Sequence, residues 1–216
     1  MKVEIWSDVM CPFCYIGKRK FEHALAQFEH KENVEIEWKS FQLNPSLKTD
    51  PNKNINQYLA EIKGWSVTYA QQLNNRVTEM AKDVGLVYDF DKAVVANSFN
   101  AHRLTHLAKK NEKGDAMEER LFRAYFTEGK NIDDHETLRT LAADIGLDST
   151  EVNHLLESHL YADAVQNDAY EAQQVGAQGV PFYVFDNRFA VSGAQPTEIF
   201  LNVLNQAMKE TNRLAG

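Results

Sequence analysis

The sequence predicts an α/β fold that is interrupted by a large all-helical insertion. Two observations indicate this fold. A strand–helix–strand pattern occupies the first 41 residues, and two further strands followed by a helix lie beyond residue 180. Between these ends, apolar residues recur with helical spacing alone. The 216 residues suffice for one large domain or for two small domains with cores of their own.

The amino-terminal pattern predicts a strand, a helix and a second strand. Residues 3–7 are mostly β-branched or aromatic, and Pro12 suits the first turn of the helix that follows. One face of this helix is apolar at helical spacing, through Phe21, Ala24, Leu25 and Phe28. Residues 34–41 alternate between apolar and charged side chains, which is typical of a half-buried strand. Together these elements predict a βαβ unit with a right-handed crossover.

Helical patterns follow one another through the middle of the chain. They cover residues 55–63, 66–84, 98–110, 115–127, 136–145 and 151–160. Their apolar stripes are typical of residues that form a core rather than a ligand site. We therefore expect residues 51–164 to form a helical insertion domain.

Strands return near the carboxyl terminus, after a further helix near 161–175. The patterns at 182–185 and 189–192 flank the turn-forming tripeptide Asp186-Asn187-Arg188, which predicts a hairpin before a last helix. We expect residues 1–50 and 165–216 to form one discontinuous α/β domain.

The charge balance argues against a nucleic-acid partner. The 23 Lys and Arg residues are outnumbered by 31 Asp and Glu residues, so the formal net charge is −8. Nucleic acids are bound through clustered basic side chains. The richest basic run, Lys18-Arg19-Lys20, is followed by Glu22, and we interpret it as a solvated helix face.

Neither a membrane segment nor a secretory signal is evident. No apolar stretch approaches the roughly 18 residues that span a bilayer. The first ten residues contain no apolar core and no small-residue cleavage site. We expect a cytoplasmic protein without a membrane partner.

The chain contains only two cysteines, Cys11 and Cys14, at the start of the first predicted helix. Backbone N–H groups and the positive end of the helix dipole favour a thiolate there, so we expect Cys11 to be largely ionised at neutral pH. Cys14 lies one turn further along, where it should be less exposed. It can attack a mixed disulfide at Cys11, so the pair predicts dithiol–disulfide exchange.

Four residues near these cysteines are candidates for substrate binding. Pro12 fixes the backbone between the cysteines, and Phe13 adds no charge that could stabilise a thiolate. In the motif Gly179-Val180-Pro181-Phe182, a cis Pro181 would hold its loop against the cysteines and leave backbone groups of Val180 free for a peptide. Alternatively, Pro181 simply occupies the first position of a strand, where proline is tolerated.

Two other interpretations of the cysteines remain open. They can be buried structural thiols, or they can bind zinc together with His102 and His106, which are spaced for one helical face. However, His102 follows Cys14 by 88 positions, against a spacing of roughly a dozen in zinc fingers. A histidine pair on a polar helix face is usually exposed, and we predict no metal site.

Motifs along nearly the whole chain resemble the thioredoxin-like DsbA family, specifically its signal-less FrnE-like branch. They are Ser7-Asp8-x-x-Cys11-Pro12-x-Cys14-Tyr15-x-Gly17, Asn100-Ala101-His102-Arg103-Leu104, Phe122-Arg123-Ala124-Tyr125-Phe126, Gly179-Val180-Pro181-Phe182-Tyr183-Val184-Phe185 and Val191-Ser192-Gly193-Ala194-Gln195-Pro196. The resemblance implies a thioredoxin fold split by a helical insertion. It also implies dithiol–disulfide oxidoreductase activity, with Cys11 as nucleophile, Cys14 as resolving thiol and Pro181 as the cis-proline.

Two positions depart from the family pattern. Phe13 stands where this branch often has Trp and secreted relatives often have His, which leaves the redox potential open. Many thioredoxin-like proteins have a buried acid six residues before the nucleophile, and that position is Ile5 here. If the acid accepts a proton in relatives, then Asp8, Glu4 or water must serve in this chain.

The sequence therefore predicts a dithiol–disulfide oxidoreductase or isomerase that acts on protein or small-molecule disulfides and thiols. We expect no metal or organic cofactor, with glutathione as a candidate co-substrate. The oligomeric state is left open. One alternative is a glutathione-dependent transferase or isomerase of the kappa-class or hydroxychromene-carboxylate isomerase type, although those relatives typically have Ser at the first cysteine position. Another is a non-enzymatic binding or chaperone module.

Overall fold

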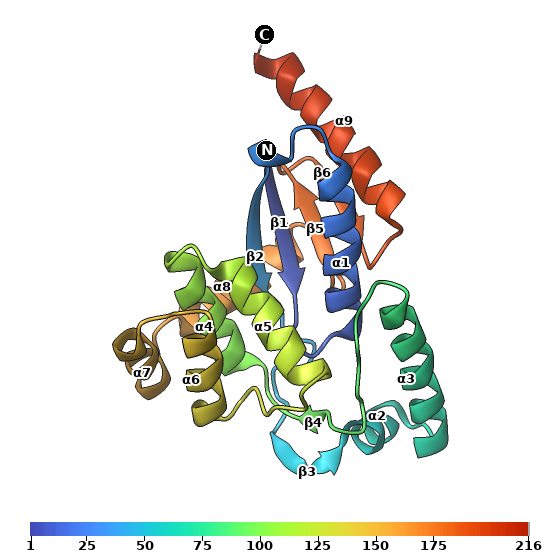
Figure 1. The fold of residues 1–216 in the computed structure, drawn as a ribbon, viewed down its shortest axis with the longest axis vertical. Helices are drawn as coiled ribbons and strands as arrows, with labels where there is room; N and C mark the ends of the chain where they lie inside the picture. The colour runs from blue at the N-terminus through green and yellow to red at the C-terminus, as the bar shows by residue number, and fades with distance from the viewer. Residues whose placement is uncertain (216) are drawn as a thin grey trace.

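Strands from both ends of the chain form one four-stranded sheet in the computed structural model, which describes residues 1–215. The strands are β1 (Lys2–Ser7), β2 (Glu35–Ser40), β5 (Phe182–Phe185) and β6 (Phe189–Ser192), in the order β2-β1-β5-β6 (Figure 1). Strand β1 pairs parallel with β2 and antiparallel with β5, which pairs antiparallel with β6. The predicted α/β fold and its carboxyl-terminal hairpin are confirmed.

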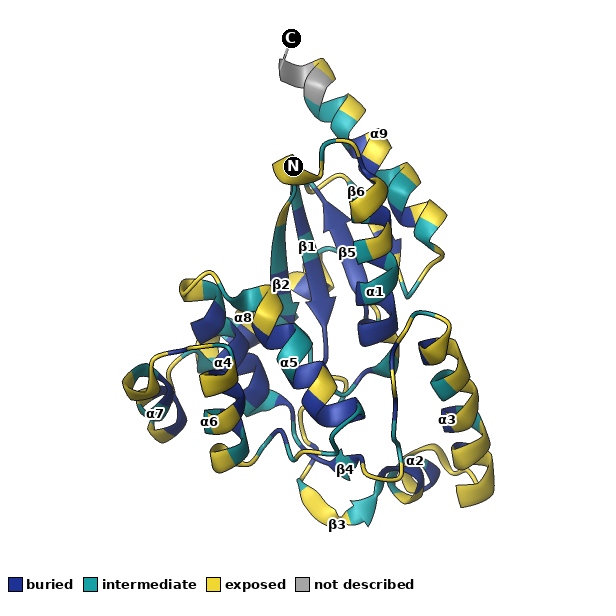
Figure 2. Cartoon of the chain, in the orientation of Figure 1, coloured by how far each residue is buried: buried dark blue, intermediate teal, exposed yellow. Residues whose placement is uncertain are grey.

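Helices cover both faces of this sheet. On one face, α1 (Pro12–Gln27) packs beside α9 (Thr197–Ala215), around the aromatic rings of Phe21, Tyr183 and Phe200. On the other face, α8 (Ala162–Gln174) contacts β2, and its Ala172 packs in a small core with Trp6. Strand β5 is accordingly buried throughout, and β1 is buried except at Lys2 and Glu4 (Figure 2).

Most of the chain between β2 and β5 is helical, as predicted. After a short 3-10 helix, η1 (Lys31–Asn33), and strand β2, the helices are α2 (Ile55–Lys63), α3 (Val67–Lys82), α4 (Phe99–Lys110), α5 (Gly114–Phe126), α6 (His135–Asp144), α7 (Ser149–Glu157) and α8. The insertion is not entirely helical, because β3 (Asp50–Asn54) and β4 (Val94–Val95) form a two-stranded antiparallel sheet. The β3 sequence, Asp-Pro-Asn-Lys-Asn, has none of the residues that favour strands. It forms a strand because tertiary contacts override its low strand propensity.

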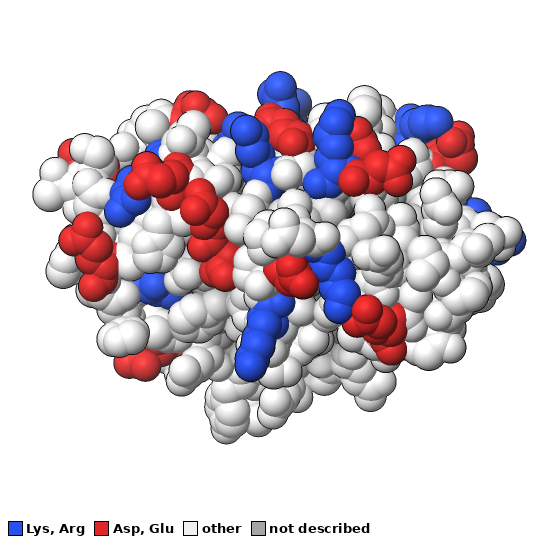
Figure 3. All heavy atoms as spheres, turned by 90° about the horizontal axis from the view of Figure 1, so that it is seen from below, with Lys and Arg blue, Asp and Glu red and all other residues white. Residues whose placement is uncertain are grey.

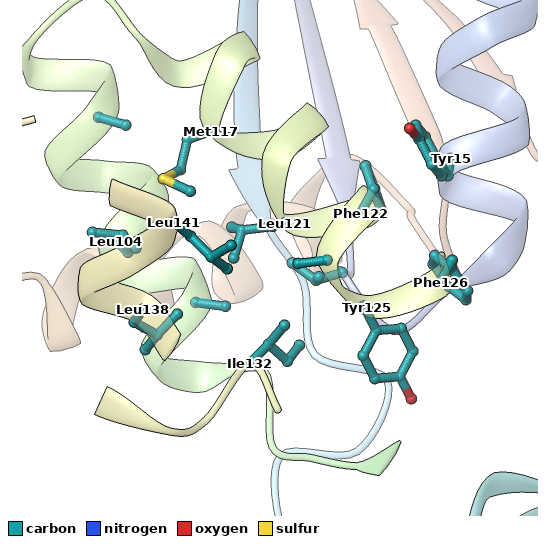
Figure 4. Packing of buried hydrophobic residues seen from close by; sticks show 14 of the residues in the cluster. Tyr15, Leu104, Met117, Leu121, Phe122, Tyr125, Phe126, Ile132, Leu138 and Leu141 are labelled. Atoms are coloured by element: carbon teal, nitrogen blue, oxygen red, sulfur yellow. The ribbon is translucent and has the colours of Figure 1, made fainter. Parts of the chain in front are cut away.

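The helices of the insertion share a large core with the first turns of α1. Tyr15 of α1 stacks on Phe122 of α5, with ring centroids 4.9 Å apart. Further into the insertion, Leu104 from α4 and Leu121 from α5 belong to the same cluster (Figure 4). Helix α1 therefore contributes to two cores, one under the sheet and one in the insertion. The division of the chain into domains at residues 51 and 165 remains a prediction.

Basic and acidic side chains are interspersed on the face of the molecule seen from below (Figure 3). The expectation that Lys18-Arg19-Lys20 forms a solvated face is wrong for Lys18, which is only 2% exposed. Its ammonium group pairs with Glu22 of α1 and, at 3.3 Å each, with Asp115 and Glu119 of α5. The basic run thus joins α1 to the insertion. Within residues 1–215, no helix is both long and apolar enough to cross a membrane.

Candidate active site

The two cysteines lie where β1 leads into α1, as the spacing predicts. Cys11 is the N-cap residue of α1, with an extended backbone (φ −86°, ψ 111°), and Pro12 opens the first turn. The Cys11 N–H donates to the Asp8 carbonyl at 2.9 Å, and the Cys14 N–H donates to the Cys11 carbonyl at 3.0 Å. A tight turn from Asp8 therefore places Cys11 at the end of the helix where backbone N–H groups lack intrahelical partners.

Both cysteines are free thiols, and both are almost completely buried. Cys11 is 4% exposed and Cys14 is 1% exposed, whereas Phe13 between them is 39% exposed. Phe13 is thus the most exposed of the three, and a substrate that approaches the cysteines meets this ring. Of the two cysteines, Cys11 is the slightly more exposed residue.

The loop before β5 lies directly against the nucleophile candidate. The Val180–Pro181 peptide bond is cis, and the Cys11 thiol lies 3.5 Å from the Val180 carbonyl oxygen, to which it donates. The Pro181 carbonyl in turn accepts from the Gly193 N–H at 2.8 Å, at the end of β6. The structure therefore brings Cys11, Val180 and Pro181 together, although about 170 positions separate them in the chain.

The surroundings of Cys14 favour its protonated form. Burial, together with the neighbouring Cys11, raises the pKa of the Cys14 thiol well above its usual value, while the Asp8 backbone and the Ser7 side chain lower it. The balance is a strong rise, because a buried thiolate loses its hydration. Its raised pKa keeps Cys14 in the thiol form at neutral pH.

A residue of the insertion that the sequence did not single out touches this turn. The Tyr88 hydroxyl donates to the Pro12 carbonyl at 2.7 Å. The Tyr88 ring stacks on Phe126 of α5, with centroids 4.6 Å apart. Tyr88 lies outside any helix or strand, in a segment without apolar periodicity, so no pattern in the sequence points to it.

Of the two histidines of α4, His102 is buried and His106 is mostly covered, with 10% of its side chain exposed, so the expectation that they occupy an exposed polar face is wrong. His102 is 1% exposed, and its Nε2 lies 3.5 Å from Asp8 Oδ1. His106 Nε2 lies 3.0 Å from Asp168 Oδ2. Each histidine thus faces a carboxylate from another element, a pairing that helical periodicity alone does not reveal. In the described part of the chain, no group of three or more His, Cys, Asp and Glu side chains is arranged to hold a metal ion.

Comparisons with known proteins agree with this geometry. The model of the DSBA-like thioredoxin domain matches residues 2–205. Protein YwbO of Bacillus subtilis (strain 168) is 30% identical over 216 residues, which are 96% of this chain and 98% of YwbO.

Two solved structures share the fold over nearly the full length. The crystal structure of a probable DsbA oxidoreductase from Streptomyces coelicolor is 40% identical, with a TM-score of 0.91, and the match covers 97% of this chain and 91% of that one. The cytosolic disulfide reductase DsbM from Pseudomonas aeruginosa, solved with GSH, is 15% identical with a TM-score of 0.67, over 97% of this chain and 100% of DsbM. At that identity, the likeness to DsbM is one of fold alone.

Proposed function

The chain belongs to the DSBA-like thioredoxin domain family, and from this premise we propose that it is a dithiol–disulfide oxidoreductase or isomerase. The observation that carries the proposal is the position of Cys11. It lies at the start of α1, one turn before Cys14, and its sulfur is 3.5 Å from the Val180 carbonyl next to Pro181. No other cysteine is present in the chain, so the redox chemistry rests on this pair.

In the reducing direction, the Cys11 thiolate attacks one sulfur of a substrate disulfide. A bond forms between Cys11 and that sulfur, and the substrate's other sulfur leaves as a thiolate and takes up a proton. Cys14 then loses its proton and attacks the Cys11 sulfur. This step releases the second substrate thiolate and leaves a Cys11–Cys14 disulfide, so that the protein is oxidised and the substrate is reduced by two electrons. Oxidation of a dithiol follows the same steps in reverse.

Four residues next to the cysteines are proposed to bind the substrate. The exposed Phe13 ring offers an apolar contact beside Cys11. Backbone groups of Val180 can pair with an extended peptide, since such pairing needs no particular side chain in the substrate. Pro181 holds this loop, and Pro12 fixes the turn between the cysteines. These contacts suit polypeptide disulfides, and also small disulfides that carry a peptide backbone.

Glutathione is the co-substrate that we propose, either to reduce the Cys11–Cys14 disulfide or to form a mixed disulfide with Cys11. DsbM, whose fold the chain shares, was solved with GSH and is named a cytosolic reductase. We further propose a cytoplasmic location and membership of the FrnE-like branch, on the motifs that contain Cys11 and Pro181.

The decisive experiment compares wild type with Cys14→Ser and Cys11→Ser in oxidised glutathione, by intact-protein mass spectrometry. Wild type is expected to end as the Cys11–Cys14 disulfide. Cys14→Ser is expected to accumulate one glutathione on Cys11, because no second thiol can release it. Cys11→Ser is expected to accumulate far less adduct, since the raised pKa of Cys14 keeps that thiol protonated and a thiol reacts far more slowly than a thiolate.

An assay of insulin reduction provides the functional side of the test. Both variants are expected to lose it. If Cys14→Ser formed no adduct, or if Cys11→Ser reduced insulin as wild type does, the assignment of the two roles would be wrong. If Cys14→Ser lost insulin reduction but still catalysed the conjugation of glutathione to another molecule, the result would favour a glutathione transferase instead.

A further inference from the structure

A carboxylate lies buried beneath the loop that carries the cysteines. Asp8 is 1% exposed, and its two oxygens accept from the backbone N–H groups of Met10 at 3.2 Å and Leu43 at 2.7 Å. These bonds tie the loop before α1 to the loop after β2. They also hold the negative charge of Asp8 at a fixed place behind the active-site turn.

Opposite Asp8 lies a buried histidine from the insertion. His102 Nε2 is 3.5 Å from Asp8 Oδ1, and both side chains are 1% exposed. Burial lowers the pKa of His102, but Asp8, Glu118 and Asp168 raise it, and the balance is a rise above the ordinary value. An imidazolium that faces a carboxylate in a closed interior forms a neutral pair, whereas either group alone is an uncompensated buried charge.

Asp8 is in direct contact with both cysteines through its backbone. Its carbonyl accepts the Cys11 N–H at 2.9 Å, and its backbone lowers the pKa of the Cys14 thiol against the larger effect of burial. The other acids considered from the sequence do not lie in this place. Residue 5 is a fully buried isoleucine, and Glu4 pairs with Lys2 and Lys39 along the sheet. Asp8 and His102 are therefore the charged groups placed behind the thiols.

We propose that His102 is a positioning residue of the active site, which acts through Asp8 to balance the charge behind Cys11 and Cys14 and thereby sets their dithiol–disulfide equilibrium. The inference deepens the proposed function and rests on it. A positive charge at His102 favours the dithiol state, because it stabilises any thiolate formed there, and the disulfide can form none. The negative charge of Asp8 acts in the opposite direction, and the two effects offset each other in the native pair.

Other titratable groups face this pair from the elements packed around it. Glu118 of α5 is 2% exposed, accepts from Thr105 Oγ1 at 3.0 Å and keeps its other oxygen without a hydrogen-bond partner. Burial raises the pKa of Glu118, which favours its neutral form. Tyr125 of α5 lies near Asp8, and its buried hydroxyl also has a raised pKa. Asp168 of α8 faces His102 less closely than it faces His106. The charged partner that a substitution of His102 affects most is therefore Asp8.

The test measures the equilibrium between the protein and glutathione at neutral pH, with acid quenching, alkylation and mass spectrometry. The variants are His102→Gln, Asp8→Asn and the double variant, and His106→Gln is the matched control one turn along α4. His102→Gln is expected to shift the equilibrium toward the disulfide on the order of tenfold, because it leaves the charge of Asp8 uncompensated behind the thiols. Asp8→Asn is expected to shift it much less, because burial lowers the pKa of His102 and the unpaired imidazole loses its proton. The double variant is expected to match Asp8→Asn. His106→Gln is expected to change little.

A structural role for His102 would not make its effect depend on the charge of Asp8. A shift by His102→Gln that persists in the Asp8→Asn background, or an equal shift for His106→Gln, would overturn the inference. Should Asp8→Asn fail to fold, NMR titration of the His102 imidazole in the wild-type protein decides. Linkage requires its pKa to be higher in the dithiol than in the disulfide form, and equal values would refute the coupling. A wild type that forms no disulfide with glutathione would instead refute the proposed function itself.

Discussion

The backbone of Gly17 lies against the hydroxyl group of Tyr183, in a contact that leaves no room for a side chain. A Cβ atom on Gly17 would be 2.6 Å from Tyr183 Oη and 3.0 Å from Pro181 Cγ. Glycine in the middle of a helix costs stability relative to alanine. Its presence here is explained by the close approach of α1 to β5, which brings the cysteine turn and the Pro181 loop together.

Gly17→Ala is expected to lower the free energy of unfolding by about 1–3 kcal/mol, although alanine is the better helix former. The added methyl group must displace the Tyr183 ring or Pro181. We also expect slower insulin reduction, because Pro181 and Val180 shift relative to Cys11. Urea unfolding and the insulin assay measure the two effects. A stabilised variant with unchanged activity would show that the contact is not tight.

Tyr88→Phe tests the bond between the insertion and the active-site turn. It removes the hydroxyl that donates to the Pro12 carbonyl at 2.7 Å and keeps the ring stacked on Phe126. We expect a loss of about 1 kcal/mol in the free energy of unfolding, the usual size for one hydrogen bond. Chemical denaturation of both proteins gives this number. Tyr170→Phe on the exposed side of α8 is a suitable control, since Tyr170 is 62% exposed.

Lys18→Met tests the buried ammonium group between α1 and α5. Methionine fills a similar volume but leaves Glu22, Asp115 and Glu119 without their shared cation. These carboxylates retain part of their hydration, so we expect a loss of about 2 kcal/mol, below the range for fully buried pairs. Lys110→Met is the control, because Lys110 pairs with Glu151 on the exposed surface and is expected to matter little. Equal thermal shifts for both variants would contradict the importance of burial.

Asp168 is expected to contribute to the decrease in the free energy of unfolding at acid pH. Burial raises its pKa, but His106 and the Ser40 N–H, which donates at 2.7 Å, lower it more, so the pKa lies below the ordinary value. A carboxyl with a lowered folded-state pKa stabilises the protein above its unfolded pKa of about 3.9, and this contribution disappears as the pH falls through the folded value.

We therefore expect the free energy of unfolding of wild type to fall more steeply below pH 4 than that of Asp168→Asn. Urea titrations between pH 2.5 and 7 measure both slopes. The exposed Asp163 on the same helix gives the matched control, Asp163→Asn, whose acid limb should follow wild type. Parallel acid limbs for wild type and Asp168→Asn would refute this assignment.

Local patterns predicted the elements of the fold well because their signals lie within a few residues. The strands 182–185 and 189–192 are flanked by turn residues, and α1 begins at Pro12 as its position suggested. The sheet of β3 and β4 was missed, since a segment that contains Pro51 and four polar residues resembles a loop. Its strand state depends on pairing with residues some 40 positions away.

The candidate site shows the same limit. The CxxC pair and Pro181 could be identified because their motifs are local and resemble a family. Lys18 and His102 were interpreted as exposed, because a charged or polar residue in a helix is usually solvated. Lys18 is buried beside Asp115, and His102 is buried beside Asp8. Each partner comes from another element, so the periodicity of the helix alone does not predict the contact.

Tyr15, the residue directly after Cys14, stacks on Phe122, and this contact has a consequence for engineering. A minimal version of this protein, trimmed to the four-stranded sheet with α1, α8 and α9, would expose the ring of Tyr15, which packs in the core of the insertion. Helix α5 covers this side of α1, so any smaller protein made from this scaffold would need a substitute for that cover.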